Sequence, residues 1–125
     1  MDTHALLWFI EGDQRLPSPL RTILDQVDTQ KYVSKISFWE LSIKKSLGKL
    51  HTRQAPSTML QQIQMTDALV LGIQSTHLTQ LETLPFHHRD PFDRLLIATA
   101  MAEGLTLISA DQHFHAYEGI SLLWE

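Results

Sequence analysis

The segment that decides the fold is HRDPFDRLLIATA, residues 88–100. Asp90 followed by Pro91 predicts the start of a helix, because a short side-chain oxygen satisfies free backbone amides and proline lacks an N–H that would be unpaired there. From Phe92 to Ala102 nearly every position is apolar, so this helix is expected to lie inside the core. Gly104 supplies the left-handed residue that ends it.

A short apolar strand follows this helix. Residues 105–108, Leu-Thr-Leu-Ile, suit a strand that is buried on both faces of a parallel sheet. Asp111 comes just after it, at the carboxyl end of the strand, where open α/β sheets place their ligands. Helix, strand and acid together predict an α/β domain with a functional residue at this edge.

The composition is that of one globular domain. The chain has 125 residues, 43% of them hydrophobic, which is enough for a core without disulfides or a structural metal. Cysteine is absent, which excludes a disulfide framework and a thiolate zinc site and agrees with a reducing compartment. No apolar run approaches the roughly 20 residues of a membrane span, and the N-terminus does not resemble a signal peptide. We therefore expect a soluble, cytoplasmic protein.

Charge is distributed unevenly along the chain. The net charge of −4 argues against nonspecific wrapping of nucleic acid. The window 31–53 nevertheless is rich in basic residues and contains a single acid, Glu40. Its basic residues are Lys31, Lys35, Lys44, Lys45, Lys49 and Arg53. This window is either a solvated helix face or a surface that guides a nucleic-acid backbone.

The remaining chain alternates helices and strands. Apolar periodicity and capping residues predict the helices, with Ser37 and Glu40 forming a capping box and Ser75 capping a later helix. The expected helices are 1–10, 20–27, 37–47, 59–65 and 76–84, with a helical turn at 114–117, and the expected strands are 31–36, 68–73, 105–108 and 120–124. This order predicts a single domain over residues 1–125, a three-layer α/β/α sandwich with a mainly parallel central sheet.

Four acids occupy positions that a parallel sheet can bring together. Asp2 precedes an apolar helix, and Asp111 follows a buried strand. Glu40 and Asp93 fall in first helical turns. Converging carboxylates raise one another's pKa unless a cation neutralises them. Mg²⁺ takes oxygen ligands and is held by few carboxylates together with substrate phosphate oxygens, and it activates water for attack on a phosphodiester.

Each acid also has a purely structural interpretation. Asp90 and Asp111 fit N-caps, and Asp93 fits a charge that favours the helix dipole. Glu40 fits an i,i+4 surface pair with a following lysine. Asp2 can be simply a polar second residue. The residues alone leave these alternatives open.

The histidines and aromatic residues add little at this stage. The pairs at 87–88 and at 113 and 115 flank the central segment, but they lack the cysteine set or the His-Glu-x-x-His pattern that indicates zinc. Three aromatic residues fit core or partner contacts better than base stacking, namely Trp39, Phe114 and Trp124.

Four motifs occur together in this chain. They are DTHALLW at 2–8, VS at 33–34 leading to FWEL at 38–41, HRDPFDRLLIA at 88–98, and LISAD at 107–111. In this order and spacing the chain resembles the PIN-domain ribonucleases of the VapC toxin type, over essentially its whole length.

The resemblance implies a metal-dependent ribonuclease. In such proteins an acidic quartet holds Mg²⁺ or Mn²⁺ and hydrolyses RNA phosphodiesters, and the matching positions here are Asp2, Glu40, Asp93 and Asp111. The resemblance further implies that Asp90 is an accessory acid or cap, that Ser109 lies near the metal and that Thr3 orients Asp2. It also implies a homodimer, a cognate antitoxin made beside the toxin, and growth arrest through RNA cleavage.

One feature of the N-terminus departs from this resemblance. Such proteins usually carry several apolar residues before the first Asp, which form a central strand, whereas Met1 stands directly before Asp2 here. Either the natural chain starts upstream or this strand is nearly absent. We expect that an apolar N-terminal extension would raise the melting temperature.

Two other classes of protein compete with a ribonuclease. A PIN-like module that binds RNA or a protein partner without cutting would bind metal tightly and show no turnover. A phosphotransferase of the haloacid dehalogenase type also begins with an Asp after a first strand. That chemistry requires a second Asp two residues later, where this chain has His4, so this class is disfavoured.

Overall fold

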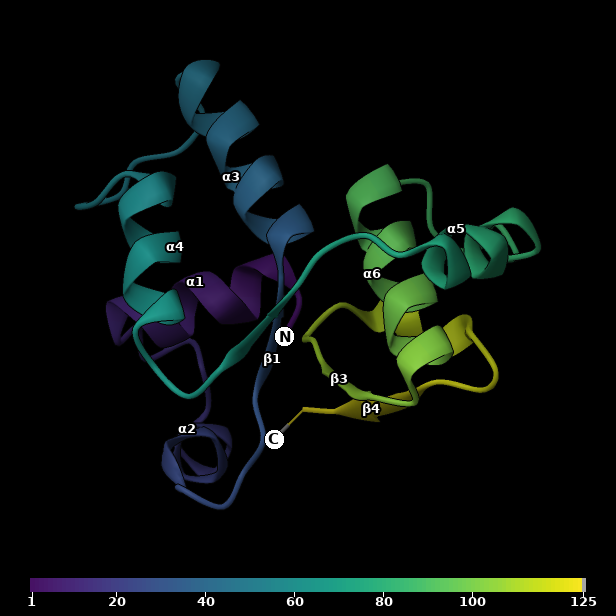
Figure 1. The fold of residues 1–125 in the computed structure, drawn as a ribbon, viewed down its shortest axis with the longest axis horizontal. Helices are drawn as coiled ribbons and strands as arrows, with labels where there is room; N and C mark the ends of the chain where they lie inside the picture. The colour runs from purple at the N-terminus through teal and green to yellow at the C-terminus, as the bar shows by residue number, and fades with distance from the viewer. Residues whose placement is uncertain (125) are drawn as a thin grey trace.

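The structure, a computed structural model, describes residues 1–124 as helices that alternate with short strands (Figure 1). The helices are α1 (Thr3–Glu11), α2 (Ser18–Asp25), α3 (Lys35–Ser46), α4 (Pro56–Gln64), α5 (Ser75–Glu82) and α6 (Pro91–Glu103), with a 3-10 helix η1 (Gln112–Ala116). The strands are β1 (Tyr32–Ser34), β2 (Leu69–Leu71), β3 (Thr106–Ile108) and β4 (Ser121–Leu123). Each helix and strand expected from the sequence is present, with its ends shifted by a few residues.

Helix α6 has the start, the end and the environment that its sequence predicts. The Asp90 carboxylate accepts the backbone N–H groups of Phe92 and Asp93, and Pro91 is the first helical residue. Gly104 ends the helix with a φ of 65°, in the left-handed region that favours glycine. Every residue from 94 to 100 is buried, so the helix lies inside the core.

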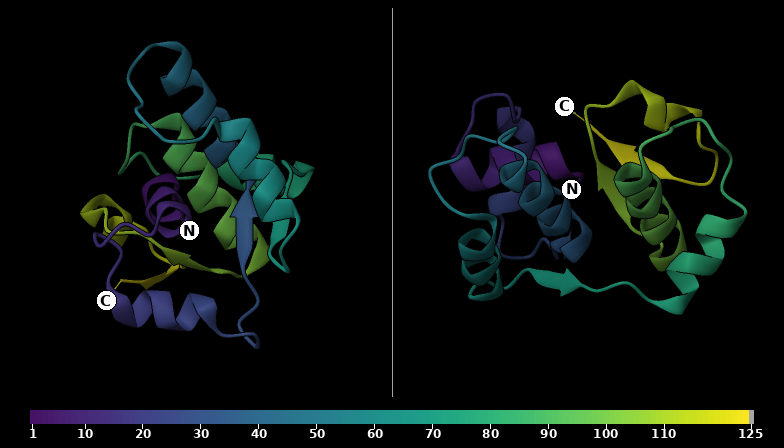
Figure 2. Two further views of the ribbon diagram at one scale, coloured as in Figure 1. Left: turned by 90° about the vertical axis from the view of Figure 1, so that its left-hand side faces the viewer. Right: turned by 90° about the horizontal axis from the view of Figure 1, so that it is seen from above.

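The strands pair in parallel, as predicted for this α/β fold, but they form two separate pairs. β1 pairs with β2, with Val33 opposite Val70, and β3 pairs with β4, with Leu107 opposite Leu122. In the part of the chain described, these are two-stranded sheets rather than one continuous central sheet. Figure 2 shows β3 and β4 on the side of the molecule that carries α6, with the N-terminus between that side and the helices α1 to α4.

A cavity of about 380 Å³ lies where a strand between β1 and β3 would complete the sheet. Its lining includes Tyr32 from β1, Leu107 from β3 and Leu96 from α6. Met1 also lines it, and the N-terminus lies between the two strands (Figure 1). The backbone N–H of Asp2 donates to the Ile108 carbonyl at 2.8 Å, but α1 begins at the next residue. The chain therefore enters this space with too few residues to bridge the two sheets.

Two predicted helix caps are wrong. Helix α3 starts two residues earlier than expected, because the hydroxyl of Ser34 accepts the Ile36 N–H at 3.1 Å, and Ser37 and Glu40 lie inside the helix instead of forming a capping box. Helix α5 is capped by Gln74 rather than by Ser75. In both cases the polar residue nearest the end of the preceding extended segment takes the cap.

The core consists of clusters that join the helices to the strands. Leu6 and Met59 belong to a cluster between α1 and α4, and Ile97 and Phe114 belong to one between α6 and η1. A third cluster, which contains Ile108, joins α1 and α2 to β3. Among residues 1–124, no helix has both the length and the apolarity needed to cross a membrane.

Candidate metal centre

Asp2 is fixed at the start of α1, beside the end of β3. Its Oδ1 accepts the N–H of Ala5 at 2.8 Å, which is the N-cap bond of this helix. Its Oδ2 accepts the hydroxyl of Ser109 at 2.6 Å. Asp2 is 5% exposed. The structure thus places Ser109 beside Asp2.

Glu40 lies on the buried side of α3, and both of its oxygens accept hydrogen bonds. The Thr3 hydroxyl donates to Oε1 at 2.7 Å, and the Lys44 Nζ donates to Oε2 at 2.6 Å. The expectation that Thr3 orients Asp2 was therefore wrong, because neighbouring residues of a helix point in different directions. The i,i+4 pair exists but is not a surface pair, since the Glu40 side chain is 4% exposed.

Asp93 lies in the first turn of α6, and its pKa is raised by burial and by the charges of other acids. Burial is the main cause that raises the pKa of this carboxyl, and the charge of Asp90 is the next. The charges of Glu40 and Asp2 raise it further, whereas the His88 ring opposes them. The pKa of Asp93 reaches about 7. Acids from α1, α3 and α6 therefore lie close enough to repel one another.

Asp111 caps η1 at the carboxyl end of β3. Its Oδ1 accepts the backbone N–H of His113 at 2.9 Å, and its own N–H donates to the Ser109 oxygen at 3.0 Å. Burial acts to raise the pKa of Asp111, but hydrogen bonds from His113 and His88 outweigh it, and the pKa lies below its ordinary value. Asp111 thus stays ionised, and Ser109 connects it to Asp2.

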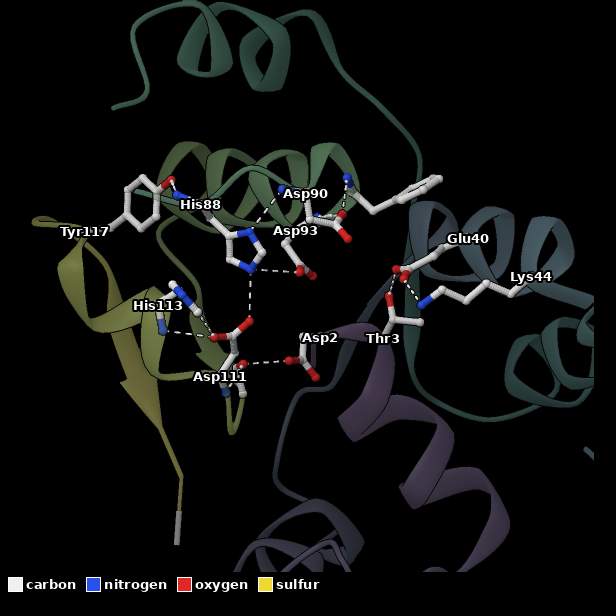
Figure 3. A network of polar contacts seen from close by, with 12 residues as sticks. Asp2, Thr3, Glu40, Lys44, His88, Asp90, Asp93, Asp111, His113 and Tyr117 are labelled. Carbon is white, nitrogen blue, oxygen red and sulfur yellow. Dashed lines mark hydrogen bonds and ion pairs between the residues drawn. The ribbon is translucent and has the colours of Figure 1, made fainter. Parts of the chain in front are cut away.

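His88 is the site residue that sequence reasoning missed. Its Nε2 lies 2.9 Å from Oδ2 of Asp111 and 3.1 Å from Oδ2 of Asp93 (Figure 3). Its Nδ1 accepts the backbone N–H of Asp90 at 3.1 Å. The signal in the sequence is the spacing His-x-Asp before a helix start, which places an imidazole over the N-cap.

Asp90 has a capping role in this structure. Its Oδ1 accepts the N–H groups of Phe92 and Asp93 at 2.8 and 3.1 Å. This geometry matches the cap interpretation, and the charge of Asp90 still acts on its neighbour Asp93.

The donor set of the site fits a hard divalent cation. Its oxygens come from Asp2, Glu40, Asp93 and Asp111, carried by four separate elements. Lys44 compensates Glu40, whereas burial and the charges of neighbouring acids together raise the pKa of Asp93. Carboxylate oxygens without thiolates suit Mg²⁺ or Mn²⁺. Among the described residues, the group whose ligand atoms all lie within 4.8 Å of one another is His88, Asp111 and His113.

The basic window and the exposed aromatic residue lie along α3, which carries Glu40. Lys31 pairs with Asp67 at 3.5 Å, and Lys44 pairs with Glu40. The other basic residues of the window, Lys35, Lys45, Lys49 and Arg53, are exposed. Trp39 is 55% exposed and meets the ring of Phe92 edge-on, whereas Phe114 belongs to the core.

The site and the fold together define an α/β protein with a carboxylate centre at the ends of parallel strands and helix starts. The PIN domain family matches residues 1–120. The chain therefore belongs to the PIN domain family, whose members are typically nucleases. A comparison with curated proteins gives no match.

Two solved structures share this fold. One is the crystal structure of VapBC2 from Rickettsia felis bound to a DNA fragment from their promoter, with a TM-score of 0.72 and 16% sequence identity over 98% of this chain and 96% of that chain. The other is DNA-bound VapBC from Salmonella typhimurium, with a TM-score of 0.72 and 17% identity over 98% of this chain and 93% of that chain. At sequence identities of 16% and 17%, the similarity to these two structures shows a shared fold alone.

Proposed function

We propose that this protein is a metal-dependent endoribonuclease and the toxin of a toxin-antitoxin pair. The observation that carries the proposal is the chain of contacts among the acids: Ser109 bonds both Asp2 and Asp111, and the His88 ring lies between Asp111 and Asp93. The charges of Asp2 and Glu40 also act on Asp93. Nearby carboxylates that repel one another are stabilised by a divalent cation, and PIN domains are typically nucleases. The proposed metal ligands and catalytic residues are Asp2, Glu40, Asp93 and Asp111.

Each residue of the site has a defined task in this mechanism. A bound Mg²⁺ or Mn²⁺ supplies an activated water and stabilises charge on the phosphodiester. Asp2, Asp93 and Asp111 would hold that cation through their carboxylate oxygens, with Asp111 reaching it from the end of β3. Thr3 orients Glu40, and Ser109 orients Asp2, through the hydrogen bonds described above. The chain itself therefore needs no nucleophilic side chain.

Exposed basic residues of α3 and the loop after it support an RNA substrate. Lys45, Lys49 and Arg53 are exposed, and they follow Glu40 along the chain. Such residues attract a phosphate backbone by charge without reading its sequence. Their field is local, because the net charge of the chain is −4.

The partners are proposed from the two solved neighbours. Both carry the name VapBC, and both are bound to DNA. By analogy we assign this chain a cognate antitoxin, a homodimeric state and a cytoplasmic location, where the RNA would be found. Induced without its antitoxin, the protein should arrest growth, and Asp93→Asn should relieve the arrest.

RNA cleavage by the purified, antitoxin-free protein tests the enzymatic proposal. A panel of structured RNAs should be cut with Mg²⁺ or Mn²⁺ and left intact with EDTA. Asp93→Asn should lower the rate by about 10²-fold or more, because it removes a charged ligand. Asp28→Asn changes an exposed acid on another segment and should cut like the wild type.

Two results would separate the alternatives. Cutting that persists in EDTA and in Asp93→Asn contradicts the metal mechanism. A folded protein that binds metal but cuts no RNA favours the non-cleaving PIN-like module that binds RNA or protein.

Thr3→Val tests the orientation of Glu40. The substitution keeps the shape of the side chain but removes the hydroxyl that donates to Oε1. We expect metal-dependent cleavage to fall by about 10-fold or more, as is typical for lost hydrogen bonds to metal ligands. Thr3→Ser should retain most activity. Thr99→Val is the matched control, because the Thr99 hydroxyl bonds a carbonyl of its own helix, and equal activity in Thr3→Val and Thr99→Val would count against this role.

A further inference from the structure

A single ring nitrogen connects two of the proposed metal ligands. The Nε2 of His88 lies 3.1 Å from Asp93 Oδ2 and 2.9 Å from Asp111 Oδ2. The two carboxylates belong to different elements, α6 and the segment that follows β3. His88 precedes both and is 14% exposed in its side chain. The His88 ring therefore lies between the carboxylates of Asp93 and Asp111 (Figure 3).

The contacts of the His88 ring determine which nitrogen carries the proton. The backbone N–H of Asp90 points at Nδ1, at 3.1 Å, so Nδ1 must offer a lone pair. In a neutral imidazole the proton then resides on Nε2. Nε2 faces only acceptors here, the oxygens of Asp93 and Asp111, which agrees with this tautomer. His88 thus donates a hydrogen bond to Asp111, and the same Nε2 lies within ion-pair distance of Asp93.

The same tautomer argues against His88 as a metal ligand. A ligating histidine donates its other ring N–H to an acceptor, whereas the other nitrogen here already accepts an N–H. The convergence of His88, Asp111 and His113 is therefore poorly suited to an imidazole-bound transition metal. The ring acts on the carboxylates instead.

The position of the ring is itself fixed. The backbone N–H of His88 donates to the Tyr117 hydroxyl at 2.9 Å, and the ring packs against Phe114 with centroids 5.6 Å apart. Together with the Asp90 bond at Nδ1, these contacts hold the Nε2 donor in one place. A fixed donor between the two carboxylates helps to set the positions of their oxygens.

We propose that His88 is a positioning residue, which holds Asp93 and Asp111 at the spacing that the divalent cation requires. This inference rests on the proposed metal site. The Asp111 oxygen that accepts the ring N–H keeps a lone pair for the cation, and so does the Asp93 oxygen beside the ring. Without the donor, the two like charges are free to move apart, and the cation must then order them.

Mn²⁺ affinity, measured by the electron paramagnetic resonance of the free ion, tests this role without RNA. We expect His88→Ala to weaken Mn²⁺ binding by about 10- to 100-fold. His88→Gln should restore most of the affinity, because its amide nitrogen has about the reach of Nε2 and keeps an N–H donor. His115→Ala is the control, since His115 is an exposed histidine of the same η1 segment as His113.

The outcomes separate this inference from the proposed function. Wild-type protein that binds no Mn²⁺ overturns both. Wild-type affinity in His88→Ala overturns the inference alone and leaves the metal site in place. Equal loss in His88→Gln and His88→Ala, with unchanged near-UV circular dichroism, overturns it in favour of an imidazole ligand.

Discussion

Asp93→Asn is expected to stabilise the metal-free protein at pH 8 by about 2 kcal/mol, or to raise its melting temperature by roughly 8 °C, while it removes nuclease activity. The reason is the raised pKa of Asp93, which burial first and then the neighbouring acids lift from 3.8 to about 7. Asparagine removes the charge but can still accept the His88 N–H. The full shift would correspond to about 4 kcal/mol, and we halve it because water screens a side chain that is 20% exposed.

The stability gained by Asp93→Asn should grow as the pH rises. Below pH 3.8 the Asp93 carboxyl is protonated in the folded and the unfolded chain, so it contributes nothing to pH dependence. Between 3.8 and about 7 the unfolded chain has released the proton that the folded chain retains, so stability falls as the pH rises. Above about 7 the loss is complete. The advantage of Asp93→Asn should therefore grow from pH 4 to pH 7 and then level off.

Urea unfolding in EDTA across this pH range measures the effect. Asp28→Asn, an exposed acid on another segment, should show no comparable trend. A gain for Asp93→Asn that is the same at pH 4 and pH 8 would mean that the ionisation of Asp93 is not its cause. A loss at pH 8 would contradict the raised pKa of Asp93.

The second large effect is expected from an apolar segment of about four residues, such as Val-Ile-Leu-Leu, added before Met1. Such a segment can extend into the cavity of about 380 Å³ between β1 and β3. It would continue the bond already made by Asp2 to Ile108, and it would replace the Met1 amino group, whose pKa is lowered by burial. We expect the free energy of unfolding to rise by about 2 kcal/mol, because the burial of apolar side chains outweighs the cost of ordering them. This gain corresponds to ~5 to 10 °C in melting temperature.

A Gly-Ser extension of equal length is the control for the added chain itself. It removes the same buried amine but brings no apolar side chains and has little tendency to form a strand. The apolar extension should therefore melt well above both the control and the unextended protein. Equal melting temperatures for the two extensions would show that the cavity does not accept a strand.

The sequence predicted the elements whose signals are local. Asp90, Pro91 and Gly104 mark the two ends of α6 within a few residues, and the apolar run between them indicates its burial. The parallel pairing follows from the alternation of helices and strands. The division into two strand pairs was not predicted, because it depends on how far the first residues reach into the space beside β3.

The contacts within the candidate site were harder to predict, because they join distant parts of the chain. The Ser109 hydroxyl bonds Asp2 across 107 positions, and His88 meets Asp111 across 23. Residue types and motifs select the acids, but only the folded geometry assigns their hydrogen-bond donors. The Thr3 hydroxyl donates to Glu40 because its side chain points toward α3. That direction cannot be inferred from the position of Thr3 next to Asp2 in the sequence.

The most direct test of the account is the position of Mn²⁺ in crystals soaked with the ion, located by its anomalous scattering. We predict a peak coordinated by oxygens of Asp2, Asp93 and Asp111, with Glu40 bonded directly or through water, and with the His88 ring donating to the carboxylates. No peak in Asp93→Asn crystals under the same conditions would agree with this assignment. A wild-type peak that lies elsewhere, or that is held by the ring nitrogens of His88 and His113, would contradict it.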